Sequence, residues 1–294
     1  MAYRRVLVPL DGSELAERAI PYANTIAKIK GSEVILFTVS TASVGQLDRP
    51  MKAYLELHAK ELQSQSIKTS TAIAYGNVAD EIIKFADNNK IDLAIISTHG
   101  HSGIKRWVLG SVALKVLYGT CVPVLLIKSR AHKISEVEFK KLLVPLDGSP
   151  FSEASIPYVK ELAKGTGGEI ILLRVSEPPI LPADRSPAIK PSWEEYRDIL
   201  MAEIQRQAEE YLEGIKANLG KSGIKVRSQA ILGKAAESIL QVAQKEDINL
   251  IAMTTQGRTR ISRWVYGNVA SRIVEESLQP VLLTHPSVPK QPSA

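Results

Sequence analysis

The stretch LVPLDGS at Leu7–Ser13 recurs without change at Leu143–Ser149. A second pair of similar stretches follows, IDLAIISTHGHSGIKRWVLGSVALKVL at 91–117 and INLIAMTTQGRTRISRWVYGNVASRIV at 248–274. Internal similarity of this kind indicates that one structural unit is used twice. The sequence therefore predicts two domains of similar plan.

The spacing of the repeats defines the expected domain organisation. The matched stretches lie further apart in the second copy, so we expect an insertion there, near 177–197. We expect the first domain at 1–130 and the second at 140–286, which suits a chain of this length. A polar linker at 131–139 joins them, and a tail follows at 287–294.

Apolar runs alternate with helical patterns in each copy. Val6–Leu10 is typical of a strand buried on both faces, and Ser13 is placed to cap the helix that follows. Pro21 and Pro157 fall inside the first helix of each copy, where we expect a kink. Alternation of strands and helices predicts an α/β fold with parallel sheets. We expect strands at 6–10, 34–39, 70–74, 93–97, 122–127, 142–146, 169–175, 225–231, 249–254 and 281–284. We expect helices at 13–30, 51–66, 78–88, 111–118, 149–164, 193–219, 234–246 and 268–278.

The composition favours a cytoplasmic protein without a membrane or nucleic-acid partner. The chain has 294 residues, of which 45% are hydrophobic and 23% charged, as in ordinary globular proteins. It has neither an apolar run of about 18 residues nor an apolar signal region at its start. The net charge of +6 is not gathered into dense Lys/Arg blocks. Cys121 is the only cysteine, which excludes an intrachain disulfide, and we expect it to be an inert core thiol.

Two segments at the ends of expected strands carry the candidate chemistry. In an open α/β sheet, ligands bind outside the carboxyl ends of the strands. Asp11 follows the first strand, and Gly100 and Gly110 follow the fourth, where a helix begins at Ser111. The glycines let a ligand approach the backbone, and the helix N-terminus offers N–H groups to a phosphate. Asp11 suits the ribose hydroxyls of a nucleotide. Alternatively it closes an Asx turn before Gly12, and the two roles are compatible.

These residues resemble the nucleotide motif of the universal stress protein family, Gly-x2-Gly-x9-Gly-Ser/Thr, together with its Val-Pro-x-Asp strand element. The resemblance extends twice over nearly the whole chain. It implies two Rossmann-like domains of the HUP type, each a five-stranded parallel sheet of order 3-2-1-4-5 flanked by helices. It also implies that the fifth strands, 124–127 and 281–283, pair within the chain as a pseudo-dimer, with a homodimer possible in addition. In the first copy it implies nucleotide contacts from Pro9, Asp11, Val39, Ser97, Gly100, Gly110, Ser111 and Val112. Their counterparts in the second copy are Pro145, Asp147, Val175, Thr254, Gly257, Gly267, Asn268 and Val269.

Both copies depart from the family motif at its first glycine. Ser97 and Thr254 stand there, and either Cβ could crowd a ligand. Asn268 replaces the motif serine or threonine, and asparagine also caps helices well. The first copy is therefore the better candidate for a nucleotide site, and the second copy remains a candidate. His99 and His101 lack a third nearby ligand, so we expect no metal held by the protein, whereas Mg²⁺ bound through phosphates needs none.

The resemblance implies an ATP- or ADP-binding protein with a regulatory role in the stress response. The sequence has no Gly-x4-Gly-Lys-Ser/Thr loop, and no acid–base pair is evident near the expected phosphates, so we expect no efficient catalysis. Two alternatives remain open. One is a slow ATPase or nucleotide-dependent transferase, and the other is a scaffold that binds no nucleotide, which Ser97 and Thr254 keep possible.

Overall fold

The structure, a computed structural model, describes residues 3–40, 48–98, 110–128, 137–179, 193–255 and 267–285. Its strands are β1 Arg5–Pro9, β2 Glu33–Ser40, β3 Thr69–Tyr75, β4 Leu93–Ser97, β5 Val124–Ile127, β6 Lys141–Pro145, β7 Glu169–Ser176, β8 Lys225–Leu232, β9 Leu250–Thr254 and β10 Val281–Thr284. Its helices are α1 Glu14–Glu17, α2 Ile20–Lys30, α3 Asp48–Ser64, α4 Val78–Asn88, α5 Ser111–Gly119, the 3₁₀ helix η1 Ser152–Ser155, α6 Ile156–Thr166, α7 Trp193–Gly220, α8 Ala235–Lys245 and α9 Asn268–Glu276. Every expected strand forms, with its ends shifted by no more than two residues.

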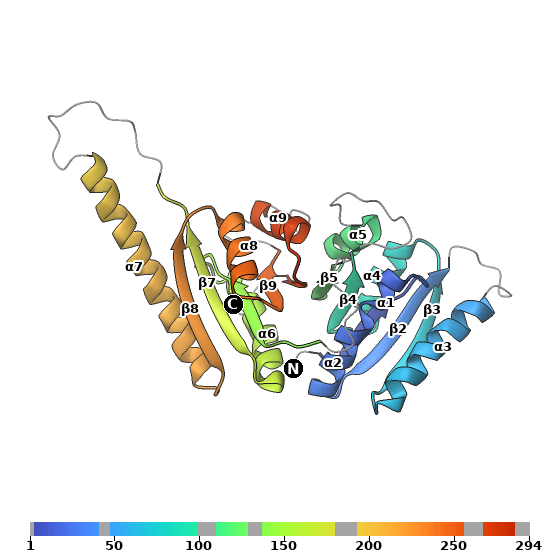
Figure 1. The fold of residues 1–294 in the computed structure, drawn as a ribbon. Coiled ribbons are helices and arrows are strands. Elements are labelled where there is room, and N and C mark those ends of the chain that lie inside the picture. The colour runs from blue at the N-terminus through green and yellow to red at the C-terminus, as the bar shows by residue number, and fades with distance from the viewer. Residues whose placement is uncertain are drawn as a thin grey trace, which may run out of the picture.

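All ten described strands form one sheet, in the order β3-β2-β1-β4-β5-β10-β9-β6-β7-β8. Each copy thus contributes five parallel strands in the expected order 3-2-1-4-5. The copies meet where β5 and β10 pair antiparallel, with Leu125 opposite Leu282. The expected pairing of the fifth strands within the chain is therefore confirmed, and the α/β fold with it (Figure 1).

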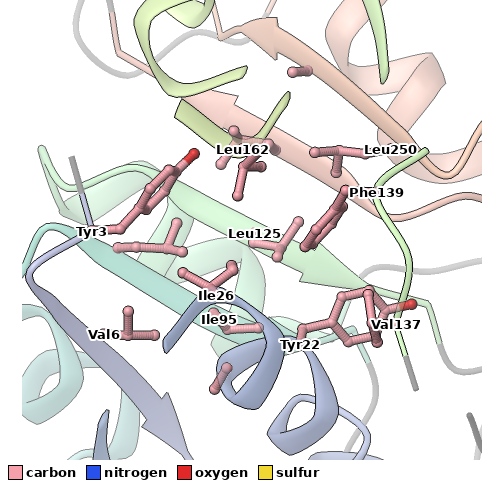
Figure 2. Close-up of a cluster of buried hydrophobic side chains, with 14 of the residues drawn as sticks. Tyr3, Val6, Tyr22, Ile26, Ile95, Leu125, Val137, Phe139, Leu162 and Leu250 are labelled. Atoms are coloured by element: carbon pink, nitrogen blue, oxygen red, sulfur yellow. The ribbon is translucent and has the colours of Figure 1, made fainter. Parts of the chain in front are cut away.

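The two faces of the sheet are covered by different sets of helices, and each set spans both copies (Figure 1). One hydrophobic cluster lies beneath α2, α3, α6 and α7, and the other beneath α4, α5, α8 and α9. Figure 2 shows the first cluster where the copies meet: Tyr3 and Ile26 from one copy lie near Leu162 and Phe139 from the other. Because both cores cross the junction, the copies form one packed body.

The first helix of each copy is broken, where we expected a kink. In the first copy α1 ends at Glu17 and α2 begins at Ile20, so that Pro21 lies in the first turn of a new helix. In the second copy a 3₁₀ turn precedes α6, and Pro157 takes the same place. Proline has no N–H to continue a helix, but its fixed φ suits a helix start. The expectation of one continuous helix was therefore wrong.

The expectation for Cys121 was also wrong, because its side chain is exposed. It lies in the turn before β5, and that turn leaves the thiol outside while Val122 turns inward. Several other sequence expectations concern residues outside the described ranges. They include 180–192 of the expected insertion, 131–136 of the linker, the tail, His99 and His101.

Candidate functional site

A pocket of about 270 Å³ opens at the carboxyl ends of β1, β2 and β4 in the first copy. It lies where the strand order reverses, between β1 and β4, which is the usual ligand site of such sheets. The expected residues that line it are Pro9, Asp11, Val39, Ser97, Gly110, Ser111 and Val112. Gly100 is not among the described residues. The structure thus brings together the described site residues of the first copy.

The loop after β1 is an Asx turn that leads into a helix cap. The backbone N–H and the hydroxyl of Ser13 both donate to Asp11 Oδ1, at 3.0 and 2.6 Å. Gly12 has φ +83°, a left-handed conformation that glycine adopts without strain. The Ser13 hydroxyl also accepts a hydrogen bond from the Ala16 N–H at 3.1 Å and so caps α1. The turn interpretation of Asp11 is confirmed, and its exposed carboxylate also faces the pocket.

The N-terminus of α5 forms another wall of the pocket. The Gly110 N–H donates to the Thr98 carbonyl at 2.7 Å, which fixes the start of α5 beside the end of β4. Gly110 occupies the N-cap position, and Ser111 is the first helical residue. Glycine has no side chain to cap the first N–H groups of the helix. Uncapped N–H groups at a helix start favour an anion, and the helix dipole adds to this preference.

Ser97 adds a polar group next to this wall. Its Oγ is shielded from water and has no hydrogen-bond partner among the described residues. The serine that replaces the first motif glycine thus lines the pocket.

The second copy has a matching pocket of about 300 Å³. The expected residues that line it are Pro145, Asp147, Val175, Thr254, Gly267, Asn268 and Val269, and Gly257 is outside the described residues. The Ser149 N–H donates to Asp147 Oδ1 at 2.8 Å, and Gly148 has φ +85°. Gly267, not Asn268, occupies the N-cap position of α9. Asn268 is already the first residue inside the helix, so its side chain does not cap the helix. The expectation that it would do so was wrong.

The two copies differ at the ends of their fifth strands. In the second copy His285 Nδ1 lies 3.4 Å from Thr255 Oγ1, and burial lowers the pKa of His285. In the first copy the equivalent residue is Lys128, whose ammonium group donates to the carbonyl of Val274 at the end of α9. Burial lowers the pKa of Lys128 to about 8, against the smaller opposing effect of Glu275.

A tyrosine and a glutamate lie behind each Asx turn. The Tyr54 hydroxyl donates to Glu17 at 3.1 Å, and the Tyr211 hydroxyl donates to Glu153 at 2.9 Å. Burial and the neighbouring glutamate raise the pKa of both phenols. In the second copy Arg174 lies over the Tyr211 ring, with Cζ 5.0 Å from its centroid.

Sequence reasoning missed several other residues that line the first pocket, and it missed Arg174. Phe37, Thr38, Val78 and Ile82 line the first pocket, from β2 and α4. In the sequence they follow the ordinary core pattern of a strand and an amphipathic helix, so nothing marks them as site residues. Arg174 is found only by aligning the copies, because it stands where the first copy has Thr38.

In the part of the chain that the structure describes, no three His, Cys, Asp or Glu side chains gather as they would to hold a metal ion. None of the described helices has the length and apolarity required to span a membrane.

Comparisons with known proteins identify the family of this chain. The universal stress protein family model matches residues 2–128 and 138–285. Two universal stress proteins of Methanocaldococcus jannaschii are similar to about half of this chain. One is 29% identical over 154 residues, 50% of this chain and 95% of its own. The other is 30% identical over 145 residues, 49% of this chain and 81% of its own.

A solved structure is similar over both copies. The crystal structure of a universal stress protein from Archaeoglobus fulgidus superposes with a TM-score of 0.69 and 22% identity, covering 98% of this chain and all of that one. At this identity the likeness concerns the fold alone. The family model matches in both copies, and the chain therefore belongs to the universal stress protein family, with two of its domains in tandem.

Proposed function

We propose that this chain is an adenine-nucleotide-binding regulator of the stress response, with one nucleotide site in each copy. The observation that carries the proposal is the convergence of three features on each pocket: apolar walls, an Asx-turn aspartate and an uncapped helix N-terminus. These suit a base, a ribose and a phosphate chain, respectively.

Each part of the nucleotide has a proposed contact in the first pocket. The base lies against the apolar walls near Val39, which β2 and α4 supply. The ribose hydroxyls donate to Asp11, and the phosphates accept hydrogen bonds from the N–H groups of Ser111 and Val112 at the start of α5. The nucleotide is ATP or ADP, and a Mg²⁺ ion would be carried by its phosphates. In the second copy Asp147 takes the role of Asp11, and the N–H groups of Asn268 and Val269 take those of Ser111 and Val112.

The proposed domains are residues 1–130 and 140–286, and the proposed location is the cytoplasm, where a single thiol stays reduced. The proposed role is regulation by occupancy and not rapid turnover. A homodimer is not needed to complete either pocket, because each is lined by one copy.

The nucleotide content of freshly purified protein tests the proposal. The protein is denatured without dialysis, and released nucleotide per chain is measured by chromatography and mass spectrometry. We expect ATP or ADP at one to two per chain. No released nucleotide, followed by no calorimetric binding of added Mg-ATP, would contradict the proposal.

Single-pocket variants assign the sites. Gly110→Val should abolish binding to the first pocket and Gly267→Val binding to the second, because each added side chain blocks the approach to a helix N-terminus. At Gly267 a Cβ would have its nearest neighbour, the Thr255 carbonyl oxygen, at 3.9 Å, so the fold has room for the change. Unchanged stoichiometry in both variants would count against this placement of the phosphates.

A further inference from the structure

Strand register places a threonine and an arginine at equivalent positions beside the two pockets. Phe37 on β2 pairs with Pro9, and Leu173 on β7 pairs with Pro145. The next residues along these strands, Thr38 and Arg174, are therefore counterparts. Thr38 is neutral and 3% exposed. The second copy thus has a positive charge where the first has none.

The Arg174 guanidinium lies between α7 and the Asx turn. Its Cζ is 5.0 Å from the centroid of the Tyr211 ring. On the other side, its Cζ, Nη1 and Nη2 all lie 3.0 Å from where a Cβ on Gly148 would be. Three equal distances mean that the flat guanidinium faces the Gly148 backbone. Gly148 directly follows Asp147, which lines the second pocket, so this cation lies beside the Asx turn that forms one rim of that pocket.

Among the described residues, the charges beside the two rims differ as a result. The first rim has the carboxylates of Asp11 and Glu17, and His58 Nε2 lies 3.4 Å from the latter. The second rim has the carboxylates of Asp147 and Glu153, with Arg174 beside them. A ribose hydroxyl is recognised by a carboxylate, whereas a phosphate on the ribose is repelled by a carboxylate and bound by arginine.

We infer that the second pocket takes an adenine nucleotide that carries a phosphate on its ribose, whereas the first takes one with both ribose hydroxyls free. In the second pocket the remaining hydroxyl donates to Asp147, and the ribose phosphate reaches past the rim to Arg174. This inference rests on the proposed function, since it assumes that Asp147 marks the ribose.

The test compares two ligands by calorimetry in single-pocket proteins. ADP and adenosine 3′,5′-bisphosphate are titrated into Gly110→Val, which keeps the second pocket, and into Gly267→Val, which keeps the first. The second pocket should bind the bisphosphate at least as tightly as ADP. The first should prefer ADP by about tenfold, because a ribose phosphate there meets Asp11, and the neutral Thr38 stands at the position of Arg174.

Arg174→Gln in the Gly110→Val protein isolates the charge. Bisphosphate affinity should fall about tenfold or more, while ADP affinity changes less than about threefold. Arg174→Lys should restore part of the loss, because it keeps the charge without the planar fork. Thermal melting checks that each variant folds, since Arg174 also packs on Tyr211.

Each outcome separates the inference from the proposed function. Equal loss of both ligands in Arg174→Gln would mean that Arg174 only holds the Asx turn, and would overturn the inference. No change for either ligand, or rejection of the bisphosphate by the unaltered second pocket while ADP binds, would overturn it too and leave the proposed function standing. If the second pocket binds neither ligand, the proposed function fails for that pocket and the inference falls with it.

Discussion

A single carboxylate oxygen organises the turn after the first strand of each copy. In the hydrogen bonds that the structure describes, Asp11 uses Oδ1 for both bonds to Ser13, and Asp147 uses Oδ1 for the Ser149 N–H. In the first copy the turn and a ligand therefore need not compete for the same atom of Asp11. Separating these two roles requires variants that keep one and remove the other.

Asp11 variants separate the turn from the ligand contact. In the Gly267→Val protein, Asp11→Ala should weaken ADP binding about tenfold, because both the turn and the ribose acceptor are lost. Asp11→Asn retains an oxygen that can close the turn but lacks the charge. Its ADP affinity should lie between that of Asp11→Ala and that of the unaltered protein. Calorimetry measures each affinity. If Asn binds ADP as well as Asp, then Asp11 acts through the turn alone.

At the scale of secondary-structure elements, side-chain hydrogen bonds satisfy backbone groups at the ends of two helices. Ser13 caps α1 through the Ala16 N–H. Lys128, at the end of β5, donates to the last turn of α9 in the other copy. Both contacts satisfy backbone groups that a helix leaves unpaired. Their loss should therefore be measurable as a change in stability.

Removing the cap of α1 should destabilise the protein modestly. Ser13→Ala loses the side-chain acceptor, and we expect the free energy of unfolding to fall by about 1 kcal/mol. Ser13→Thr keeps a hydroxyl acceptor and serves as the matched control. Denaturant unfolding measures both variants. A Ser13→Ala protein as stable as the unaltered one would show that the cap contributes nothing.

The buried amine of Lys128 should make stability depend on alkaline pH. Burial lowers its pKa in the folded protein to about 8, whereas in the unfolded chain the pKa is about 10.4. Between these values the unfolded chain binds more protons, so the stability of the protein rises with pH. Relative to Lys128→Met, the unaltered protein should gain up to about 3 kcal/mol between pH 7 and pH 10.5.

Urea unfolding across this pH range measures the effect. Lys115→Met, which removes an exposed lysine on α5, is the control and should show no comparable dependence. A constant difference between the unaltered protein and Lys128→Met at all pH values would contradict the prediction.

The element scale also shows what sequence patterns can and cannot predict. Apolar runs such as Val6–Leu10 located the strands because parallel strands are buried on both faces. The break at Pro21 was missed because a proline inside a helical pattern allows either a kink or a fresh start, and neighbouring packing decides. Arg174 was missed because its importance comes from strand register and not from any local pattern. The helix starts at Ser111 and Asn268 were predicted correctly from the alternation of strands and helices.

At the scale of the whole molecule, the two copies share one sheet and two cores. Leu125 and Leu282 are both in one cluster and face each other across the junction. Neither copy can therefore unfold without exposing apolar surface of the other. This predicts a single cooperative transition for a protein with two similar domains.

Phe139→Ala tests this cooperativity. Phe139 is fully buried at the junction, with its ring centroid 6.4 Å from that of Tyr22 in the other copy. We expect the free energy of unfolding to fall by about 3–5 kcal/mol, with calorimetry still showing one transition. Tyr22→Phe, which keeps the ring, is the control and should change stability far less. Two separate transitions in the unaltered protein would contradict the prediction.

The antiparallel pairing of β5 with β10 has a consequence for how such a protein can evolve. In a symmetric homodimer every substitution appears in both chains, so a change that improves one binding site also alters the other. Here both partners are encoded in one gene, and each half can accept changes that the other never receives. Equivalent positions already differ between the copies, as in Ser97 and Thr254, Thr38 and Arg174, and Lys128 and His285. Covalent linkage lets the two copies take on different functions while they remain paired through one sheet.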